Sequence, residues 1–153
     1  MAGHLKTSSG KKITSKIGKI GIVVSKWNED ITEALLLGAI DGLKTAGVSS
    51  KNILVRHVPG SFELPLAAQQ LGQKKEVSGV ICLGCLIKGD TPHFEVIAQA
   101  TAAGIMEVGL KLNKPVVFGV ITTLTRQQAI DRCGGKLGNK GEEAAVTLLE
   151  MVG

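Results

Sequence analysis

The sequence predicts one α/β domain with a flavodoxin-like, three-layer sandwich fold: a four-stranded parallel sheet of order 2-1-3-4 with helices on both faces. Two observations predict it. Short aliphatic runs alternate along the chain with longer segments of helical periodicity. These runs are apolar without interruption, as in strands that are buried on both sides of a parallel sheet. The length of 153 residues suits one such domain.

The first strand is the β-branched run at 19–25, KIGIVVS. A helical pattern follows at 29–46, with apolar or small residues at helical spacing. Asn28 is suited to cap the start of this helix, with two acids in the first turn, and Gly47 is suited to end it. These signals predict a first strand–helix unit with a well-defined start and end.

The second and third strands are the apolar runs 52–58 and 79–83. A Pro-Gly turn follows the second strand, and a short helix is expected from residue 63 or 64 to residue 71. The third strand leads into a glycine-bearing loop at 84–90. Strands that alternate with helices in this way favour parallel pairing.

The fourth strand is predicted at 116–120, after a long helix that runs to about residue 112. Thr91 is the expected N-cap of that helix, because Pro92 suits the first helical position. Thr125 and Gln128 form a capping box for another helix. That helix is expected to end near 133, where a Gly-Gly interruption at 134–135 follows, and a final helix is expected from about 138 to 151.

The charge distribution argues against a nucleic-acid-binding face. The formal net charge is +5, but residues 1–19 hold five lysines and no acid. The remaining 13 basic residues equal the 13 acidic ones, whereas a nucleic-acid footprint should be a basic face of the folded domain. We therefore expect a basic, flexible tail at 1–16 and one domain at 17–153.

The composition also favours a cytoplasmic protein. No stretch of about 20 apolar residues is present, so we expect no membrane span. No apolar run follows the first lysines, so we expect no signal peptide. The three cysteines cannot all pair within one chain, which fits a reducing compartment.

Chemically distinctive residues follow all four predicted strands, so they should meet at one rim of the sheet. The loop from Lys88 to His93 combines a helix N-terminus, a lysine and a histidine. Free N–H groups at a helix N-terminus bind anions such as phosphate. Taken alone, these residues leave a simpler interpretation open, in which Thr91 and Pro92 only start a helix and His93 is a surface residue.

Three segments in order resemble the lumazine synthase family: VPGSFELP at 58–65, KGDTPHFE at 88–95, and VVFGVITTLTRQQAIDRCGGKLGNKGEEAA at 116–145. The resemblance extends over residues 17–152. It implies a transferase that condenses 5-amino-6-(D-ribitylamino)uracil with 3,4-dihydroxy-2-butanone 4-phosphate. The expected products are 6,7-dimethyl-8-ribityllumazine, phosphate and water, in the penultimate step of riboflavin biosynthesis, with no cofactor and no metal.

The resemblance also implies roles for single residues. His93 matches the residue that transfers protons, and Arg132 matches an arginine that clamps the phosphate from a neighbouring subunit. Trp27 should stack on the pyrimidine, at a position where many members have Phe. The full set for the ribitylaminouracil is Trp27, Ser61, Phe62, Glu63, Cys85, Leu86, Ile87 and Phe118. The full set for the butanone phosphate is Gly89, Asp90, Thr91, Arg132 and Lys140.

Each of these residues also has a simpler interpretation. Trp27 could be a lid on the core, Phe62 and Phe118 could be core residues, and Glu63 could be a first-turn helix acid. Arg132 could be a surface residue and Lys140 a solvated helix start. The sequence departs from the family pattern at two positions: Lys88, where many members have Arg, and Cys85, where a small apolar residue is usual.

Two motifs are set aside. Cys82 and Cys85 spell CxxC, but Cys82 lies inside a predicted strand rather than at a helix N-terminus, and no second pair completes a zinc site. The run 134–141 is rich in glycine and lysine but lacks the P-loop spacing, so we interpret it as a helix junction.

The expected partners are small-molecule substrates and further copies of the chain. The predicted helix 92–112 carries small or apolar residues in nearly every direction, so a second chain should cover part of it. The resemblance implies a pentamer with active sites shared between subunits, allows a 60-subunit shell, and allows riboflavin synthase as a partner. Two alternatives stay open: a flavin- or pterin-binding module without turnover, and a structural shell protein.

Overall fold

The computed structural model describes residues 17–152. The predicted basic tail at 1–16 lies outside the described residues. The main sheet has four parallel strands in the order β2-β1-β3-β4, which confirms the predicted fold class and strand order. The strands are β1 (Lys19–Ser25), β2 (Ile53–Val58), β3 (Val77–Ile87) and β4 (Val116–Thr123).

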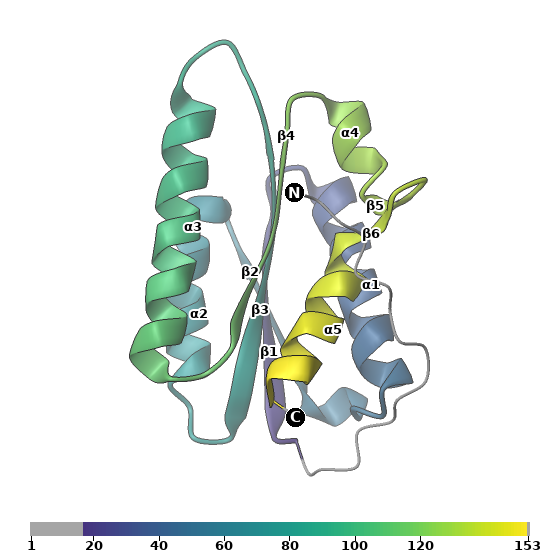
Figure 1. Cartoon of the computed structure of the whole chain (residues 1–153), viewed down its shortest axis with the longest axis vertical. Coiled ribbons are helices and arrows are strands. Elements are labelled where there is room, and N and C mark those ends of the chain that lie inside the picture. Colours follow the sequence, from purple (N-terminus) through teal and green to yellow (C-terminus); the bar gives the residue numbers. More distant parts are fainter. Residues whose placement is uncertain (1–16, 153) are drawn as a thin grey trace.

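Helices cover both faces of this sheet. Figure 1 shows α2 and α3 on one side and α1 and α5 on the other, with α4 near the end at which β3 and β4 finish. Each face has its own aliphatic core, one between the sheet and α1 and α5, the other between the sheet and α2 and α3. The helices are α1 (Glu29–Thr45), α2 (Leu64–Gly72), α3 (His93–Leu112), α4 (Arg126–Ile130) and α5 (Lys140–Val152), with 3₁₀ turns η1 (Ser50–Asn52) and η2 (Ser61–Glu63).

The two ends of α1 differ in how well the sequence predicted them. Gly47 has φ +102° and closes a Schellman motif, in which Gly47 N donates to Lys44 O and Val48 N to Leu43 O,. Asn28 occupies the N-cap position, but its side chain makes no capping hydrogen bond. The predicted side-chain cap at Asn28 is therefore wrong, and the residue instead adopts the left-handed conformation with φ 58°.

Strands β3 and β4 run further than predicted. β3 continues to Ile87 and β4 to Thr123, because residues 85–87 pair in register with 121–123. Gly84, which suggested a loop, is a strand residue where side chains approach closely: an added Cβ would lie 2.7 Å from Ser61 Oγ. The predicted loop 84–90 is thus reduced to the segment between β3 and α3.

The segment between α4 and α5 is a correction to the predicted helix junction. Residues 133–135 and 138–139 form a small antiparallel hairpin, β5 (Cys133–Gly135) and β6 (Gly138–Asn139). Gly134 and Gly138 have positive φ values of 109° and 82°, which let the chain reverse there. Asn139 Oδ1 accepts from Gly141 N at 2.8 Å and Glu142 N at 3.3 Å, so α5 begins at 140 and not at 138.

The predicted helix start is confirmed at α4 and is wrong at α3. Helix α3 begins at His93 with Pro92 at the N-cap position, so Thr91 is not the N-cap and Pro92 is not the first helical residue. Thr125 and Gln128 form the predicted capping box, although α4 ends at Ile130 rather than near 133. At α3 the Thr91 hydroxyl lies 3.5 Å from His93 N, at the long limit of a hydrogen bond,. Within residues 17–152, no helix is both long enough and apolar enough to cross a membrane.

Candidate active site

The turns after β1 and β2 are held together at the carboxyl end of the sheet. The backbone N–H groups of Lys26 and Trp27 both donate to Pro59 O at 3.2 Å. The indole of Trp27 lies over Gly60, where an added Cβ would be 3.1 Å from the ring. Trp27 is nevertheless 72% exposed, so it is not a lid on the core and its outer face is open to a ligand.

The η2 turn presents Phe62 and Glu63 beside this tryptophan. Phe62 is 59% exposed, so its interpretation as a core residue is wrong, whereas Ser61 is buried. Glu63 Oε2 accepts from Gly60 N at 3.0 Å. An acid in the first turn of a helix typically makes such a contact. The contact also fixes the orientation of the Glu63 carboxylate at the rim.

The end of β3 offers mainly backbone to a ligand. The Cys85 side chain is buried in the core on the α1 and α5 side. Its carbonyl oxygen accepts from Asn28 Nδ2 at 3.1 Å, which ties the turn after β1 to β3. Leu86 and Ile87 are half-buried and complete this edge.

The segment from Lys88 to His93 is an exposed loop that is anchored at both ends. Lys88 N donates to Thr123 O at 2.9 Å, and Lys88 Nζ lies 3.1 Å from Glu95 Oε1 in the first turn of α3. A backbone hydrogen bond at Glu95, and then the bond from Lys88, lower the pKa of the Glu95 carboxyl. The predicted site residues between these anchors are all exposed: Gly89, Asp90, Thr91 and His93.

Three predicted site residues lie elsewhere, in a cavity of about 950 Å³ along the open edge of β4. Phe118, Arg132 and Lys140 line it, and none of the predicted rim residues does. Phe118 is 44% exposed and is therefore not strand core. Arg132 Nη1 donates to Gln128 O at 2.9 Å, and Lys140 Nζ lies 2.6 Å from Glu143 Oε2.

The structure thus divides the predicted site residues into two groups within one chain. We call them the rim group, at the carboxyl ends of β1 to β3, and the edge group, which is Phe118, Arg132 and Lys140. The rim group offers exposed aromatic rings, backbone hydrogen-bonding groups and a histidine. The edge group offers an aromatic ring and two cations beside a largely apolar cavity.

Comparison with known proteins decides the family. The family model described as 6,7-dimethyl-8-ribityllumazine synthase matches residues 18–153. The chain belongs to this family. It is 52% identical over 154 aligned positions to the 6,7-dimethyl-8-ribityllumazine synthase of Cytophaga hutchinsonii, with 95% of this chain and 97% of that protein covered. It is 49% identical to the enzyme of that name from Protochlamydia amoebophila, with 97% and 86% covered, and 47% identical to the one from Thermus thermophilus, with 92% and 89% covered.

As a lumazine synthase family member, the chain is a transferase of riboflavin biosynthesis. Family membership also implies small-molecule substrates and self-association into a homo-oligomer. The resemblance read from the three sequence segments is confirmed.

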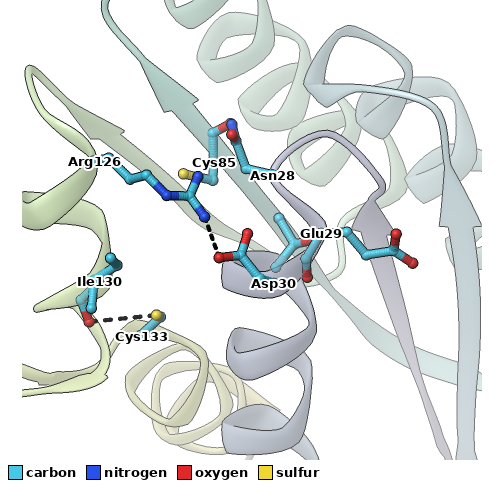
Figure 2. Close-up of polar contacts among 8 residues, drawn as sticks. Asn28, Glu29, Asp30, Cys85, Arg126, Ile130 and Cys133 are labelled. Carbon is cyan, nitrogen blue, oxygen red and sulfur yellow. Dashed lines mark hydrogen bonds and ion pairs between the residues drawn. The ribbon is translucent and has the colours of Figure 1, made fainter.

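The sequence did not predict two contacts near the site. Asn28 links the turn after β1 to β3, and Arg126 forms an ion pair with Asp30 (Figure 2). The hydrogen bond from Arg126, ahead of its charge, lowers the pKa of the Asp30 carboxyl. Asn28 was visible in the sequence only as a helix cap. The ion pair joins positions 96 residues apart, and no local pattern signals such a contact.

The cysteines show no features of a redox or metal site. Burial raises the pKa of both Cys82 and Cys85 to about 12, so neither thiol is ionised near neutral pH. All three cysteines are free. Within the described part of the chain, no group of three His, Cys, Asp or Glu side chains could hold a metal ion.

Proposed function

We propose that the rim group of one chain and the edge group of its neighbour form one active site. In that site, 5-amino-6-(D-ribitylamino)uracil condenses with 3,4-dihydroxy-2-butanone 4-phosphate to give 6,7-dimethyl-8-ribityllumazine, phosphate and water. One observation carries the proposal: aromatic and backbone groups suited to a pyrimidine lie at the rim, while cations suited to a phosphate line a separate cavity at the open sheet edge. A pyrimidine and a phosphate are bound by different kinds of side chain, so a site that holds both substrates needs the rim group and the edge group.

The rim group would bind the ribitylaminouracil. Trp27 offers its exposed face for stacking on the pyrimidine,. The η2 residues Ser61, Phe62 and Glu63 would hold the ribityl chain and the ring. The backbone of Cys85, Leu86 and Ile87 would bind the uracil edge, and Phe118 of the neighbour would close the pocket.

The butanone phosphate would lie at the start of α3. The loop Gly89, Asp90 and Thr91 precedes the N-terminus of that helix, whose dipole favours an anion. Arg132 of the neighbour would add a charge-assisted contact, of roughly 1.5–3 kcal/mol when fully formed. Lys140 would stay close to Glu143, its partner at 2.6 Å, and would act mainly through its charge.

Catalysis would come chiefly from holding the two substrates together. The 5-amino group attacks the ketone carbonyl and loses water to give an imine. Removal of the C3 proton then expels phosphate from C4, and the enol that remains at C3 tautomerises to a second carbonyl. The ribityl-bearing nitrogen then attacks the second carbonyl and closes the ring with loss of water. His93, at the first position of α3, would move protons between these steps, because an imidazole ring can both donate and accept a proton.

We further propose that the homo-oligomer is a pentamer. Large apolar side chains on the outer side of α3 support a contact with another chain there: Val96 is 61% exposed, Met106 65% and Leu110 76%. This uncovered surface continues to the open edge of β4, because Met106 and Leu110 also line its cavity. The 60-subunit shell and the association with riboflavin synthase stay predictions, as does the cytoplasmic location, which the three free thiols support,.

Substitution of Arg132 tests the proposal. We expect Arg132→Ala to raise the KM for the butanone phosphate strongly or abolish its use, while binding of the ribitylaminouracil changes little. Arg132→Lys should rescue only in part, because an ammonium cannot form the paired contact of a guanidinium. Lumazine fluorescence measures turnover. Equal losses for both substrates would instead indicate a misfolded or dissociated protein and would contradict the assigned role.

A further inference from the structure

The ion pair between Arg126 and Asp30 connects two parts of the molecule that carry the two groups of site residues. Arg126 is the first residue of α4, and Asp30 lies in the first turn of α1. Figure 2 shows the guanidinium reaching from α4 to the carboxylate at the start of α1. The charges of both residues also act on the Cys85 thiol, so the pair lies close to the end of β3.

On the α4 side, the pair is linked to Arg132. The carbonyl of Gln128 accepts from Arg132 Nη1 at 2.9 Å, and Arg132 N donates to Ala129 O at 3.0 Å. The position of α4 therefore sets the position of the Arg132 guanidinium.

The helix α4 needs such outside anchors. It has only five residues, and so short a helix is not stable alone. The Thr125–Gln128 capping box holds its own first turn, and Ala129 is its buried contact with the core. Among the ion pairs found in residues 17–152, the one with Asp30 is the one that joins α4 to α1.

On the α1 side, the start of the helix is anchored by hydrogen bonds of Asn28. The carbonyl of Asn28 accepts from Ile31 N and Thr32 N, each at 3.0 Å. The Asn28 amide binds Cys85 O at 3.1 Å. The start of α1 is thus tied to the end of β3. Asp30 therefore lies on an anchored segment and can hold Arg126, the first residue of α4, in place.

We infer that Arg126 and Asp30 are a positioning pair that holds α4, and through it the guanidinium of Arg132, in the orientation that binds phosphate. Neither residue needs to touch a substrate. The inference rests on the phosphate-binding role proposed for Arg132.

Stability and phosphate binding should respond differently to loss of the pair. Both side chains are more than half exposed, at 51% and 62%, so the pair adds little to global stability and is screened by salt. A guanidinium–phosphate contact depends on orientation, so a small shift of Arg132 should weaken it.

The experiment compares Arg126→Gln and Asp30→Asn with two matched controls in the full-length protein. Glu29→Gln removes an acid from the same first turn of α1, and Figure 2 shows Glu29 pointing away from Arg126. Lys136→Gln removes a cation that pairs with Asp131 at 3.8 Å in the segment next to α4. The readouts are the KM of each substrate, inhibition by inorganic phosphate, and the midpoint of thermal unfolding.

We expect each test variant to raise the KM for the butanone phosphate and the inhibition constant of phosphate by about two- to fivefold, the ratio that matches the coupling of an exposed ion pair. The KM for the ribitylaminouracil and the unfolding midpoint should stay at the wild-type values. The double variant should be no worse than either single variant, because both remove one interaction. Raised salt should reduce the difference from wild type, and both controls should behave as wild type.

Three outcomes overturn the inference: unchanged phosphate inhibition in the test variants, equal effects of Glu29→Gln and Asp30→Asn, or a parallel rise in both KM values with a lower unfolding midpoint. If Arg132→Ala still loses phosphate binding in any of these cases, the inference fails alone and the proposed function stands. If Arg132→Ala leaves phosphate binding unchanged, the role of Arg132 itself is wrong.

Discussion

Aromatic side chains are scarce in this chain and are mostly kept out of the core. The sequence has one Trp, three Phe and no Tyr. Trp27, Phe62 and Phe118 are exposed, and both cores consist of aliphatic residues, alanine and cysteine. Exposed large aromatic rings are retained where a ligand or another chain covers them. At the residue scale, their placement is the clearest structural support for the two proposed halves of the site.

His93 allows a prediction about the size of a single residue's contribution. Because holding two substrates together supplies most of the rate enhancement, proton transfer should add about 10²–10⁴-fold at most. We expect His93→Ala to lower kcat within that range while leaving measurable activity. Single-turnover measurement of lumazine formation tests this, with circular dichroism as a control for folding. Wild-type turnover in the variant would remove His93 from the mechanism.

Cys82 allows a prediction about alkaline pH. Burial raises the pKa of its thiol from 9.0 to about 12, so the unfolded chain loses this proton at lower pH than the folded protein does. The contribution to stability is intact below about pH 9 and is lost between pH 9 and 12. Urea unfolding between pH 8 and 11 should therefore show a shallower loss of stability in Cys82→Ala than in wild type, even if Cys82→Ala is less stable overall. Identical slopes would contradict the prediction.

At the scale of elements, apolar periodicity predicted the fold because it reports burial, which decides which segments are strands and helices. It failed where local signals conflicted with pairing. Gly84 suggests the end of a strand, yet it lies within β3, because β3 stays paired with β4 beyond it. A glycine is needed at this position because a side chain would clash with Ser61 Oγ. The β5–β6 hairpin rests on two glycines with positive φ and on Asn139, whose amide reaches Ala34 O at 3.0 Å. That contact spans 105 residues, and a local pattern cannot show it.

The same limit applied to the candidate site. The rim group could be predicted because loops after parallel strands meet at one edge, and the resemblance named its members. The separation of Phe118, Arg132 and Lys140 from the rim within one chain could not be read from spacing. It depends on β4 being an edge strand with an open side.

The contact between α1 and α5 gives a prediction at this scale. A Cβ added at Gly141 would lie 1.9 Å from Leu35 O, a clash with backbone that no side-chain rotation relieves. We expect Gly141→Ala to lower the free energy of unfolding by about 3 kcal/mol or more, at the upper end of overpacking effects. Gly109→Ala in α3 is the control, because its added Cβ would meet neighbours only at 3.4 Å or more and Ala favours a helix by about 1 kcal/mol over Gly. Equal stability of the two variants in urea would contradict this account.

At the scale of the whole molecule, the described chain is a three-layer sandwich that leaves apolar surface uncovered. The outer side of α3 exposes Val96, Met106 and Leu110, and the edge of β4 is open beside a large cavity. A soluble monomer seldom leaves such apolar surface uncovered. The sequence indicated the need for a cover on α3, and the structure extends the uncovered surface to the edge of β4, because Met106 and Leu110 also line that cavity. In the proposed site, the edge group of one chain meets the rim group of the next. These are different surfaces, so the contact is head-to-tail, and closure of such contacts gives a ring.

Shared active sites can be tested by mixing two impaired variants. Arg132→Ala keeps an intact rim group, and His93→Ala keeps an intact edge group. If the groups meet across a subunit boundary, unfolding the two variants together in equal amounts and refolding them should create native sites that neither variant has alone. Random placement around a head-to-tail ring makes roughly a quarter of the boundaries native, so activity should rise to about that fraction of wild type.

As a control, Arg132→Ala mixed with Phe118→Ala should show no gain, because both changes lie in the edge group and no boundary becomes native. Sedimentation should show the same assembly in every mixture. An active species of 15.9 kDa, the mass of one chain, would falsify the ring and the shared site together, because a monomer would then hold both groups in one pocket.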